Sequence, residues 1–306
     1  MYTNAMSGML QAFLAYASFS ISDAFSKLLA GRLDPFEVAF SGGVFGFLIL
    51  PFIKLKHESW ADMVHTPHFG MWCVRALAVF LATASSVEAF MLLSMPEALS
   101  LMFLMPFFVT ILSVTFLREK VNGWAWLSVA LGFIGVLIVL RPGFRALGFG
   151  HLCALVAAVA NAVGVIAYRL AGNNTPRLSL FGSSLFGPLI GNGILMAHGA
   201  TMPQGVDWAY LFGYGFLAAL GQLLLMMATA SAPANRVALP QYSQMIWGVA
   251  LSYTLFRQPL DIWEIVGVTI VTLSGLVNWI RQKIVTRYLA LHGTALSKNP
   301  HIANQD

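Results

Sequence analysis

The chain contains two similar stretches, and this repetition limits the folds that it can adopt more than any other feature. Residues 95–141 and 232–281 each hold an apolar helix, a short polar turn, a tryptophan and a second apolar helix that ends at an arginine. Trp124 aligns with Trp263, and the turn at 116–119 aligns with the turn at 255–258. Duplicated sets of apolar helices are the usual build of secondary transporters. The repetition therefore predicts a membrane protein made of two related halves.

The composition points to lipid as the surrounding solvent. Hydrophobic residues make up 58% of the chain and charged residues 9%, whereas about a quarter of the residues of a soluble domain are charged. So much apolar surface excludes a water-soluble globule. The net charge of +5 is modest. It fits the bias of basic residues toward one side of a membrane rather than nucleic-acid binding, so we predict the lipid bilayer as a partner and no nucleic acid. Cys73 and Cys153 are too few for a disulfide scaffold and lack the spacing of metal ligands.

Ten apolar segments are long enough, at roughly 20 residues each, to cross the hydrocarbon core as helices. They are 8–30, 36–53, 71–94, 97–117, 123–140, 151–171, 178–197, 208–229, 232–256 and 262–280. The sequence therefore predicts an all-α integral membrane protein with ten transmembrane helices. The fifth and tenth segments carry almost no polar residues, so we expect these two helices on the outside as a scaffold.

The duplication includes the earlier helices as well. Gly8–Lys27 aligns without a gap with Gly150–Arg169, so five helices are followed by five more. Because five is odd, the second half must enter the membrane in the opposite orientation, which makes the halves inverted repeats. We expect the first repeat at 8–140 and the second at 151–280. The second helix of each half also carries two glycines four residues apart, which lets backbones approach closely. These pairs are Gly42/Gly46 and Gly187/Gly191.

The distribution of Lys and Arg predicts that both termini lie in the cytoplasm. In that orientation nine basic residues fall on the inside and four on the outside. The inside set is Lys54, Lys56, Arg118, Lys120, Arg177, Arg281, Lys283, Arg287 and Lys298, and the outside set is Arg32, Arg141, Arg145 and Arg257. The polar tail at 281–306 would then lie along the cytoplasmic face.

Several short motifs resemble those of a known family. Pro106 is followed after twelve residues by Glu119, and the ninth segment contains the string ALPQYSQMIW at 238–247. The string DAFSK at 23–27 closes the first helix. Together these motifs resemble the drug/metabolite transporter superfamily, and within it the EamA-type ten-helix transporters. The resemblance covers roughly residues 8–282 and implies transport of small organic solutes. The second half departs from the motif, because Gln258 and Met245 stand where the first half has Glu119 and Pro106.

Charged residues within apolar segments are candidates for function, because a charge in the bilayer centre costs about 2.5–3.5 kcal/mol. Glu88 has no cation within four residues, so we expect it to bind a proton or a cationic group. Arg236 precedes the proline-containing string and would hold an anionic part of a solute. A structural ion pair between these two residues is an equally good interpretation. Glu37 and Arg75 begin their segments, which favours a place at the membrane interface.

Two further carboxylates have both structural and functional interpretations. Asp23 lies four residues before Lys27, so the two charges could neutralise each other on one helix face. Glu97 lies in the first turn of its segment, where it would either stabilise the positive helix end or line a cavity. We predict that Glu88, Asp23 and Glu97 take part in coupling to protons or cations.

Uncharged polar side chains complete the predicted site. They would orient the solute by hydrogen bonds from the first, sixth, eighth and ninth segments. With the two charged residues the predicted solute site is Glu88, Arg236, Gln241, Tyr242, Gln244, Asn161, Gln222 and Ser22. No HExxH, GxSxG, Walker or GxGxxG motif is present, so we expect no enzyme activity, no catalytic residues, no metal and no cofactor.

These features predict a secondary active transporter that moves a small organic metabolite or drug-like solute across the cytoplasmic membrane. Alternating access would use bending at Pro106 and Pro240. A proton or a counter-solute would drive transport, and the chain would act as a monomer or a homodimer. Two other classes stay open from the sequence: a non-transporting membrane scaffold, and an intramembrane enzyme that acts on lipid-linked substrates.

Overall fold

A computed structural model describes residues 2–54, 58–118, 123–141, 147–171, 175–197, 199–231, 239–258 and 261–274. The described part of the first half runs α1 (Tyr2–Leu28), α2 (Pro35–Gly46), η1 (Phe47–Ile49), α3 (Leu50–Ile53), η2 (Trp60–Met63), α4 (Phe69–Leu92), α5 (Met95–Met102), α6 (Met105–Phe116) and α7 (Gly123–Leu140). The second half continues with α8 (Phe149–Ala171), α9 (Arg177–Met196), α10 (Asp207–Ser231), η3 (Leu239–Tyr242) and α12 (Ser243–Thr254), and a last helix at Ile262–Ser274. Throughout these ranges the regular structure is helical, as the sequence predicts.

The helices are long and apolar enough for a multi-pass membrane protein. Six stretches meet the length and hydropathy of a membrane span: Pro35–Ile53, Phe69–Leu92, Met95–Phe116, Phe149–Ala171, Leu178–Met196 and Asp207–Leu225. Two shorter apolar helices lie at Trp126–Leu140 and Ile262–Ser274. Every expected segment contains a described helix, but six of the described stretches reach the full criterion. The number of ten crossings therefore stays a prediction.

Helix ends follow local chemistry. Asp34 begins α2, because its Oδ1 accepts a hydrogen bond from the Phe36 amide at 2.8 Å and Pro35 occupies the first helical position. Ser94 begins α5 in the same way, with its hydroxyl accepting from the Glu97 amide at 3.4 Å. The two aligned turns also share a backbone conformation: Arg118 and Arg257 both have positive φ, at 52° and 50°. In both copies of the repeated sequence, the turn after the helix therefore contains an arginine in the left-handed backbone conformation.

Of the two prolines that we expected to act as bending points, Pro106 coincides with a helix break and Pro240 lies in a short 3₁₀ turn before α12. The fourth segment divides into α5 and α6 around Phe103 and Leu104, just before Pro106. A proline lacks the amide hydrogen and clashes with the carbonyl four residues earlier, which explains the interruption. Pro240 lies in the short η3 that precedes α12. The helix is interrupted before Pro106, and bending at either proline stays a prediction.

Glycines allow the helices of the two halves to pack closely. A Cβ at Gly187 of α9 would lie 2.0 Å from the Ala76 carbonyl oxygen of α4, so only glycine fits. Gly191 faces the Phe80 ring of α4, and Gly46 of α2 faces Leu185 of α9. The predicted glycine pairs therefore do lie at close helix contacts.

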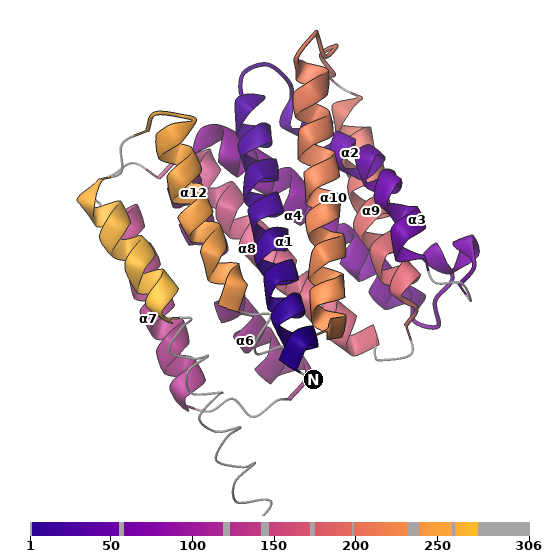
Figure 1. Ribbon diagram of the computed structural model, residues 1–306, viewed down its shortest axis with the longest axis horizontal. Helices are drawn as coiled ribbons and strands as arrows, with labels where there is room; N and C mark the ends of the chain where they lie inside the picture. Colours follow the sequence, from indigo (N-terminus) through magenta and orange to yellow (C-terminus); the bar gives the residue numbers. More distant parts are fainter. Residues whose placement is uncertain are drawn as a thin grey trace, which may run out of the picture.

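The helix α7 and the last helix, Ile262–Ser274, lie side by side at one edge of the molecule (Figure 1). This agrees with the expected scaffold position of the fifth and tenth segments. A Cβ on Gly135 would lie 2.9 Å from the Gly267 carbonyl oxygen, and a Cβ on Gly267 would lie 2.6 Å from the Gly135 carbonyl oxygen. Ser128 donates to the Ser274 carbonyl at 2.5 Å. As residue numbers rise along α7 they fall along its partner, so the two helices run antiparallel.

Candidate solute and ion site

One face of α1 gathers three of the predicted site residues against α10 and α12. The Gln244 amide of α12 donates to Asp23 Oδ2 at 3.3 Å. Ser20 donates to the Gln244 carbonyl oxygen at 3.4 Å. Ser22 is buried and donates to the Tyr214 carbonyl oxygen of α10 at 2.7 Å. These bonds bring Ser22, Asp23 and Gln244 together, and Figure 1 shows α1 between α10 and α12.

Lys27 does not pair with Asp23, although the two lie one helical turn apart. Its ammonium group donates to the carbonyl oxygen of Phe90 at 3.2 Å and also to that of Leu93. These carbonyls end α4, where a cation meets the negative end of the helix dipole. The ammonium also lies 5.5 Å from the centre of the Phe256 ring. The expected neutralisation of Asp23 by Lys27 is therefore wrong, and Lys27 fastens the end of α1 to the end of α4.

Glu97 has a partner that the sequence did not reveal. Its Oε1 lies 3.0 Å from His151 Nε2, and the two side chains are 12% and 14% exposed. The other ring nitrogen, Nδ1, accepts a hydrogen bond from the Gly148 amide at 3.0 Å. Because Nδ1 accepts, the proton of a neutral imidazole lies on Nε2 and is donated to the carboxylate. Lys27 donates to the Leu93 carbonyl oxygen, four residues before Glu97, so the pair lies beside the ends of α1 and α4.

Glu88 lies nearer to a helix end than the sequence indicated. The structure ends α4 at Leu92, which leaves Glu88 in its last turns rather than well inside the helix. The side chain is half-buried, and it makes no hydrogen bond or ion pair with any side chain that the structure describes. The end of α4 packs beside the start of α8, where Gly150 faces Leu92 and Leu93, so Glu88 lies at the same end of the bundle as Glu97.

The uncharged polar residues are more scattered. Asn161 is exposed and donates to the Ala157 carbonyl of its own helix at 2.9 Å. Gln222 of α10 and Gln241 of η3 are half-buried. These three residues make no hydrogen bond with Asp23, Glu88 or Glu97 among the described side chains. Arg236 and the side chain of Tyr242 lie outside the described residues, and so does the hypothetical ion pair between Arg236 and Glu88.

Four helix termini thus bring ionisable side chains to one end of the bundle. Lys27, Glu88, Glu97 and His151 come from α1, α4, α5 and α8, and Asp23 lies one turn below Lys27. Carboxylates next to an imidazole can exchange protons or hold a cation. Among the described residues no group of three or more His, Cys, Asp or Glu side chains has the arrangement of a metal site. Sequence reasoning missed His151 because it lies at a segment start and its partner is 54 residues away.

Comparison with known proteins identifies relatives that match along most of the chain. The sequence model of the EamA-like transporter family matches residues 6–141 and again residues 148–279. A protein of Rickettsia prowazekii (strain Madrid E) named S-adenosylmethionine uptake transporter is 24% identical over 268 residues, which cover 87% of this chain and 90% of that one. A riboflavin transporter of Rhizobium johnstonii (strain DSM 114642 / LMG 32736 / 3841) is 30% identical over 244 residues, or 77% and 78% of the two chains.

A solved crystal structure has the same fold. It superimposes with a TM-score of 0.64 and covers 93% of this chain and 99% of the other, at 16% sequence identity. Identity this low shows shared architecture and carries no information about the solute.

Proposed function

The chain belongs to the EamA-like transporter family, and we propose that it moves a small organic metabolite across the cytoplasmic membrane by alternating access. Membership makes it a multi-pass membrane transporter of a small solute and not an enzyme. The match of the family model to both halves carries this conclusion, because many secondary transporters are built from two such repeats. The solute is its principal partner, beside the surrounding lipid.

The two halves form inverted repeats in this proposal, at 8–140 and 151–280. The contact between α7 and the last helix supports it. When Trp124 is aligned with Trp263, Gly135 corresponds to Ser274 and Gly132 to Val271. The structure contains both contacts that such a two-fold relation requires, because Gly132 faces Ser274 and Gly135 faces Val271. The antiparallel direction of these helices also agrees with opposite membrane orientations.

The polar cluster at the end of α1 provides the coupling in the proposed mechanism. Asp23, Glu88 and Glu97 would take up and release protons or a counter-charge as the ends of α1, α4, α5 and α8 separate and close. The hydrogen bond between Gln244 and Asp23 supports this, because it joins α1 to α12, the helix that directly follows Pro240 and the short η3. Closure would then depend on the protonation of Asp23. Gln241, Gln222 and Asn161 would contact the solute farther along the pathway.

The relatives suggest where a search for the solute should begin. The names of the two relatives are those of proteins for S-adenosylmethionine uptake and riboflavin transport. Both solutes are polar heterocyclic metabolites with several hydrogen-bonding groups. We propose a solute of the same chemical class for this chain, because the described polar side chains of α1, α10 and α12 supply both donors and acceptors.

Uptake by the purified protein in liposomes tests the proposal. Labelled S-adenosylmethionine, riboflavin and related metabolites would be offered with and without a pH gradient, and we expect at least one to accumulate. Glu88→Gln and Arg236→Ala should each reduce uptake, whereas Asp62→Asn, in η2 at the other end of α4 from Glu88, should not. Normal uptake in both Glu88→Gln and Arg236→Ala would contradict the proposed site. Absence of both uptake and exchange across the whole panel would contradict the proposed function.

A further inference from the structure

Lys27 and Arg169 occupy equivalent positions in the two halves. They are the last aligned pair when Gly8–Lys27 is matched without a gap to Gly150–Arg169. The two side chains belong to opposite ends of the bundle, because His151 lies beside the ends of α1 and α4 and Arg169 follows it by eighteen residues in α8. A helix of that length spans about 27 Å. One basic side chain of each aligned pair therefore lies at each end of the molecule.

Lys27 joins the ends of three helices. Its ammonium group donates to the carbonyl oxygens of Phe90, at 3.2 Å, and of Leu93, both at the end of α4. It also lies 5.5 Å from the centre of the Phe256 ring, just after α12. The side chain is half-buried between these partners. Lys27 thus ties α1 to α4 and to α12 at this end of the bundle.

Arg169 meets the equivalent helix of the other half. Its guanidinium donates to Ser113 Oγ in α6 at 3.5 Å. In the alignment of the two halves Ser113 corresponds to Ser252 of α12, four residues before Phe256. Each cation therefore contacts the last part of the equivalent helix in the opposite half. The two ends differ in burial, because Arg169 is exposed whereas Lys27 is half-buried.

Two helix pairs are fastened at a second pair of aligned positions, Ser22 and Gly164. Ser22 of α1 donates to the Tyr214 carbonyl oxygen of α10 at 2.7 Å. The carbonyl oxygen of Gly164 in α8 accepts from Arg75 of α4 at 3.2 Å. These bonds favour movement of α1 with α10, and of α8 with α4. Lys27 connects one of these pairs to the other, because it extends from α1 to the end of α4.

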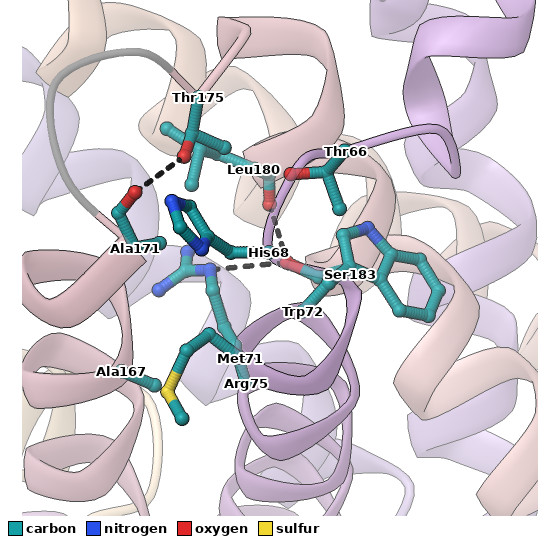
Figure 2. A pocket seen from close by; sticks show the side chains of 10 residues that line it. All are labelled: Thr66, His68, Met71, Trp72, Arg75, Ala167, Ala171, Thr175, Leu180 and Ser183. Atoms are coloured by element: carbon teal, nitrogen blue, oxygen red, sulfur yellow. Dashed lines mark hydrogen bonds between the residues drawn. The ribbon is translucent and has the colours of Figure 1, made fainter.

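Arg75 is a basic residue without an equivalent in the second half, and its contacts are of a different kind. The sequence placed it at the membrane interface, but the structure turns its guanidinium inward, toward Ser183 (Figure 2). Nε donates to Ser183 Oγ at 3.1 Å, and a terminal nitrogen donates to Ser184 Oγ at 3.0 Å. The aligned part of α10, residues 207–216, contains no basic residue. Arg75 therefore braces α4 against α8 and α9, whereas Lys27 and Arg169 form a matched set.

We infer that Lys27 and Arg169 are the two gate residues of the transport cycle, each closing one end of the solute path. This inference rests on the proposed transport function. In the described structure Lys27 is engaged, and its end is closed one turn beyond the bond between Asp23 and Gln244. In the opposite state Arg169 is engaged with α6 and the bonds of Lys27 are broken. A contact that exists in one state stabilises that state alone, so each cation shifts the balance toward closure at its own end.

The accessibility of a cysteine placed between the two gates tests the inference. Ser20 lies about two turns below Lys27 in α1 and is fully buried. Ser20→Cys, in a background of Cys73→Ser and Cys153→Ser, would be labelled with a membrane-impermeant maleimide in right-side-out and in inside-out vesicles. Lys27→Met should raise the ratio of labelling from the Lys27 side to labelling from the Arg169 side about tenfold, as expected for lost hydrogen bonds from a charged group. Arg169→Met should change this ratio in the opposite direction.

Matched variants separate gating from general effects on folding. Lys54 Nζ also lies 5.5 Å from the centre of an aromatic ring, that of Trp60, but both residues belong to the first half, so Lys54→Met should leave the ratio unchanged. Lys27→Arg keeps a charged donor and should shift the ratio less than Lys27→Met does. If Lys27→Met is not obtained as folded protein, Lys27→Gln should give a shift of the same sign. Partial unfolding would speed labelling from both sides and would not produce opposite shifts.

The outcomes separate the gates from the transport function. Shifts of the same sign in Lys27→Met and Arg169→Met, or no shift in either, would overturn the inference. Labelling from neither side in every variant would also overturn it, because a path that opens alternately must expose its middle. Solute uptake by the unmodified protein without the opposite labelling shifts would contradict the gates alone. Opposite shifts without uptake or exchange of any solute would contradict the transport function and leave the gates standing.

Discussion

The contact between Gly187 and α4 predicts a large difference between two glycine substitutions. In Gly187→Ala the new methyl carbon would lie 2.0 Å from the Ala76 carbonyl oxygen, 2.7 Å from its carbonyl carbon and 2.9 Å from its Cα. Ordinary contact begins at 3.4 Å, so the helices must separate by 3.4 − 2.0 = 1.4 Å along that direction. The obstacle is backbone, which cannot rotate away as a side chain can. Overpacking of this kind typically costs about 1–3 kcal/mol.

Gly164→Ala is the matched control. Gly164 lies in α8, which packs against the same helix α4, but its new methyl carbon would be 3.8 Å from the Ala78 Cβ, an ordinary contact. Both substitutions gain about 1 kcal/mol of helix propensity. Because this gain is common, the difference in stability between the two variants isolates the clash. At roughly 2 °C for each kcal/mol, Gly187→Ala should melt about 2–6 °C below Gly164→Ala.

The assay is thermal unfolding of the purified variants in one detergent, followed by intrinsic tryptophan fluorescence. Gly187 precedes Pro188, and a residue before proline disfavours the helical conformation when it gains a side chain. The comparison should therefore be repeated with Pro188→Ala in both variants, where the clash remains and the proline effect is absent. Equal melting temperatures for the two glycine variants in that background would refute the packing argument.

Three other predictions concern contacts between side chains or backbones of different helices and turns. Burial raises the pKa of Asp261, but the hydrogen bond and charge of Arg141 and the amides of Ile262 and Trp263 outweigh it, so the pKa lies below its ordinary value. A carboxyl with a lowered pKa stabilises the fold at pH values above the ordinary carboxyl pKa. Asp261→Asn should therefore lower the melting temperature slightly at pH 7. This difference should disappear as the pH falls through the pKa of Asp261 in the folded protein. Gly135→Ala and Gly267→Ala should each destabilise by about 1–3 kcal/mol and should not be additive, because each methyl meets the other's carbonyl; additive thermal shifts would contradict the shared contact. His151→Leu should cost about 1–3 kcal/mol by removing the imidazole donor, whereas Glu97→Gln keeps an acceptor for Nε2 and should cost less, so equal losses on thermal unfolding would argue against the pair.

Local chemistry made much of the fold predictable from the sequence. Apolar length located the helices, and prolines located their starts and breaks, because Pro35 and Pro106 act within one turn of their own position. The aligned turns gave equivalent backbone conformations at Arg118 and Arg257 for the same reason. Alternating access and the inverted orientation of the halves remain proposals.

The candidate site was harder to predict, because its contacts join distant parts of the chain. Asp23 and Lys27 are neighbours on one helix, yet Lys27 donates to the carbonyl oxygens at the end of α4, while Asp23 accepts from Gln244 of α12. Arg75 begins its segment, but hydroxyls on α9 turn its guanidinium inward. Sequence spacing reports neither the position of free carbonyls nor the hydroxyls of another helix, so these partners needed three-dimensional information.

The contact of Gly135 in α7 with Gly267 in the last helix bears on how the chain could have evolved. The contact around them is self-complementary. Gly132 faces Ser274, and the residues aligned with these two, Val271 and Gly135, also face each other. A single five-helix ancestor could have made the same contact with an inverted copy of itself, and every mutation there would have acted twice. Fusion of two such copies would release them from this constraint. Gly135 and Ser274 stand at aligned positions, so the two surfaces are no longer identical and each can be altered alone.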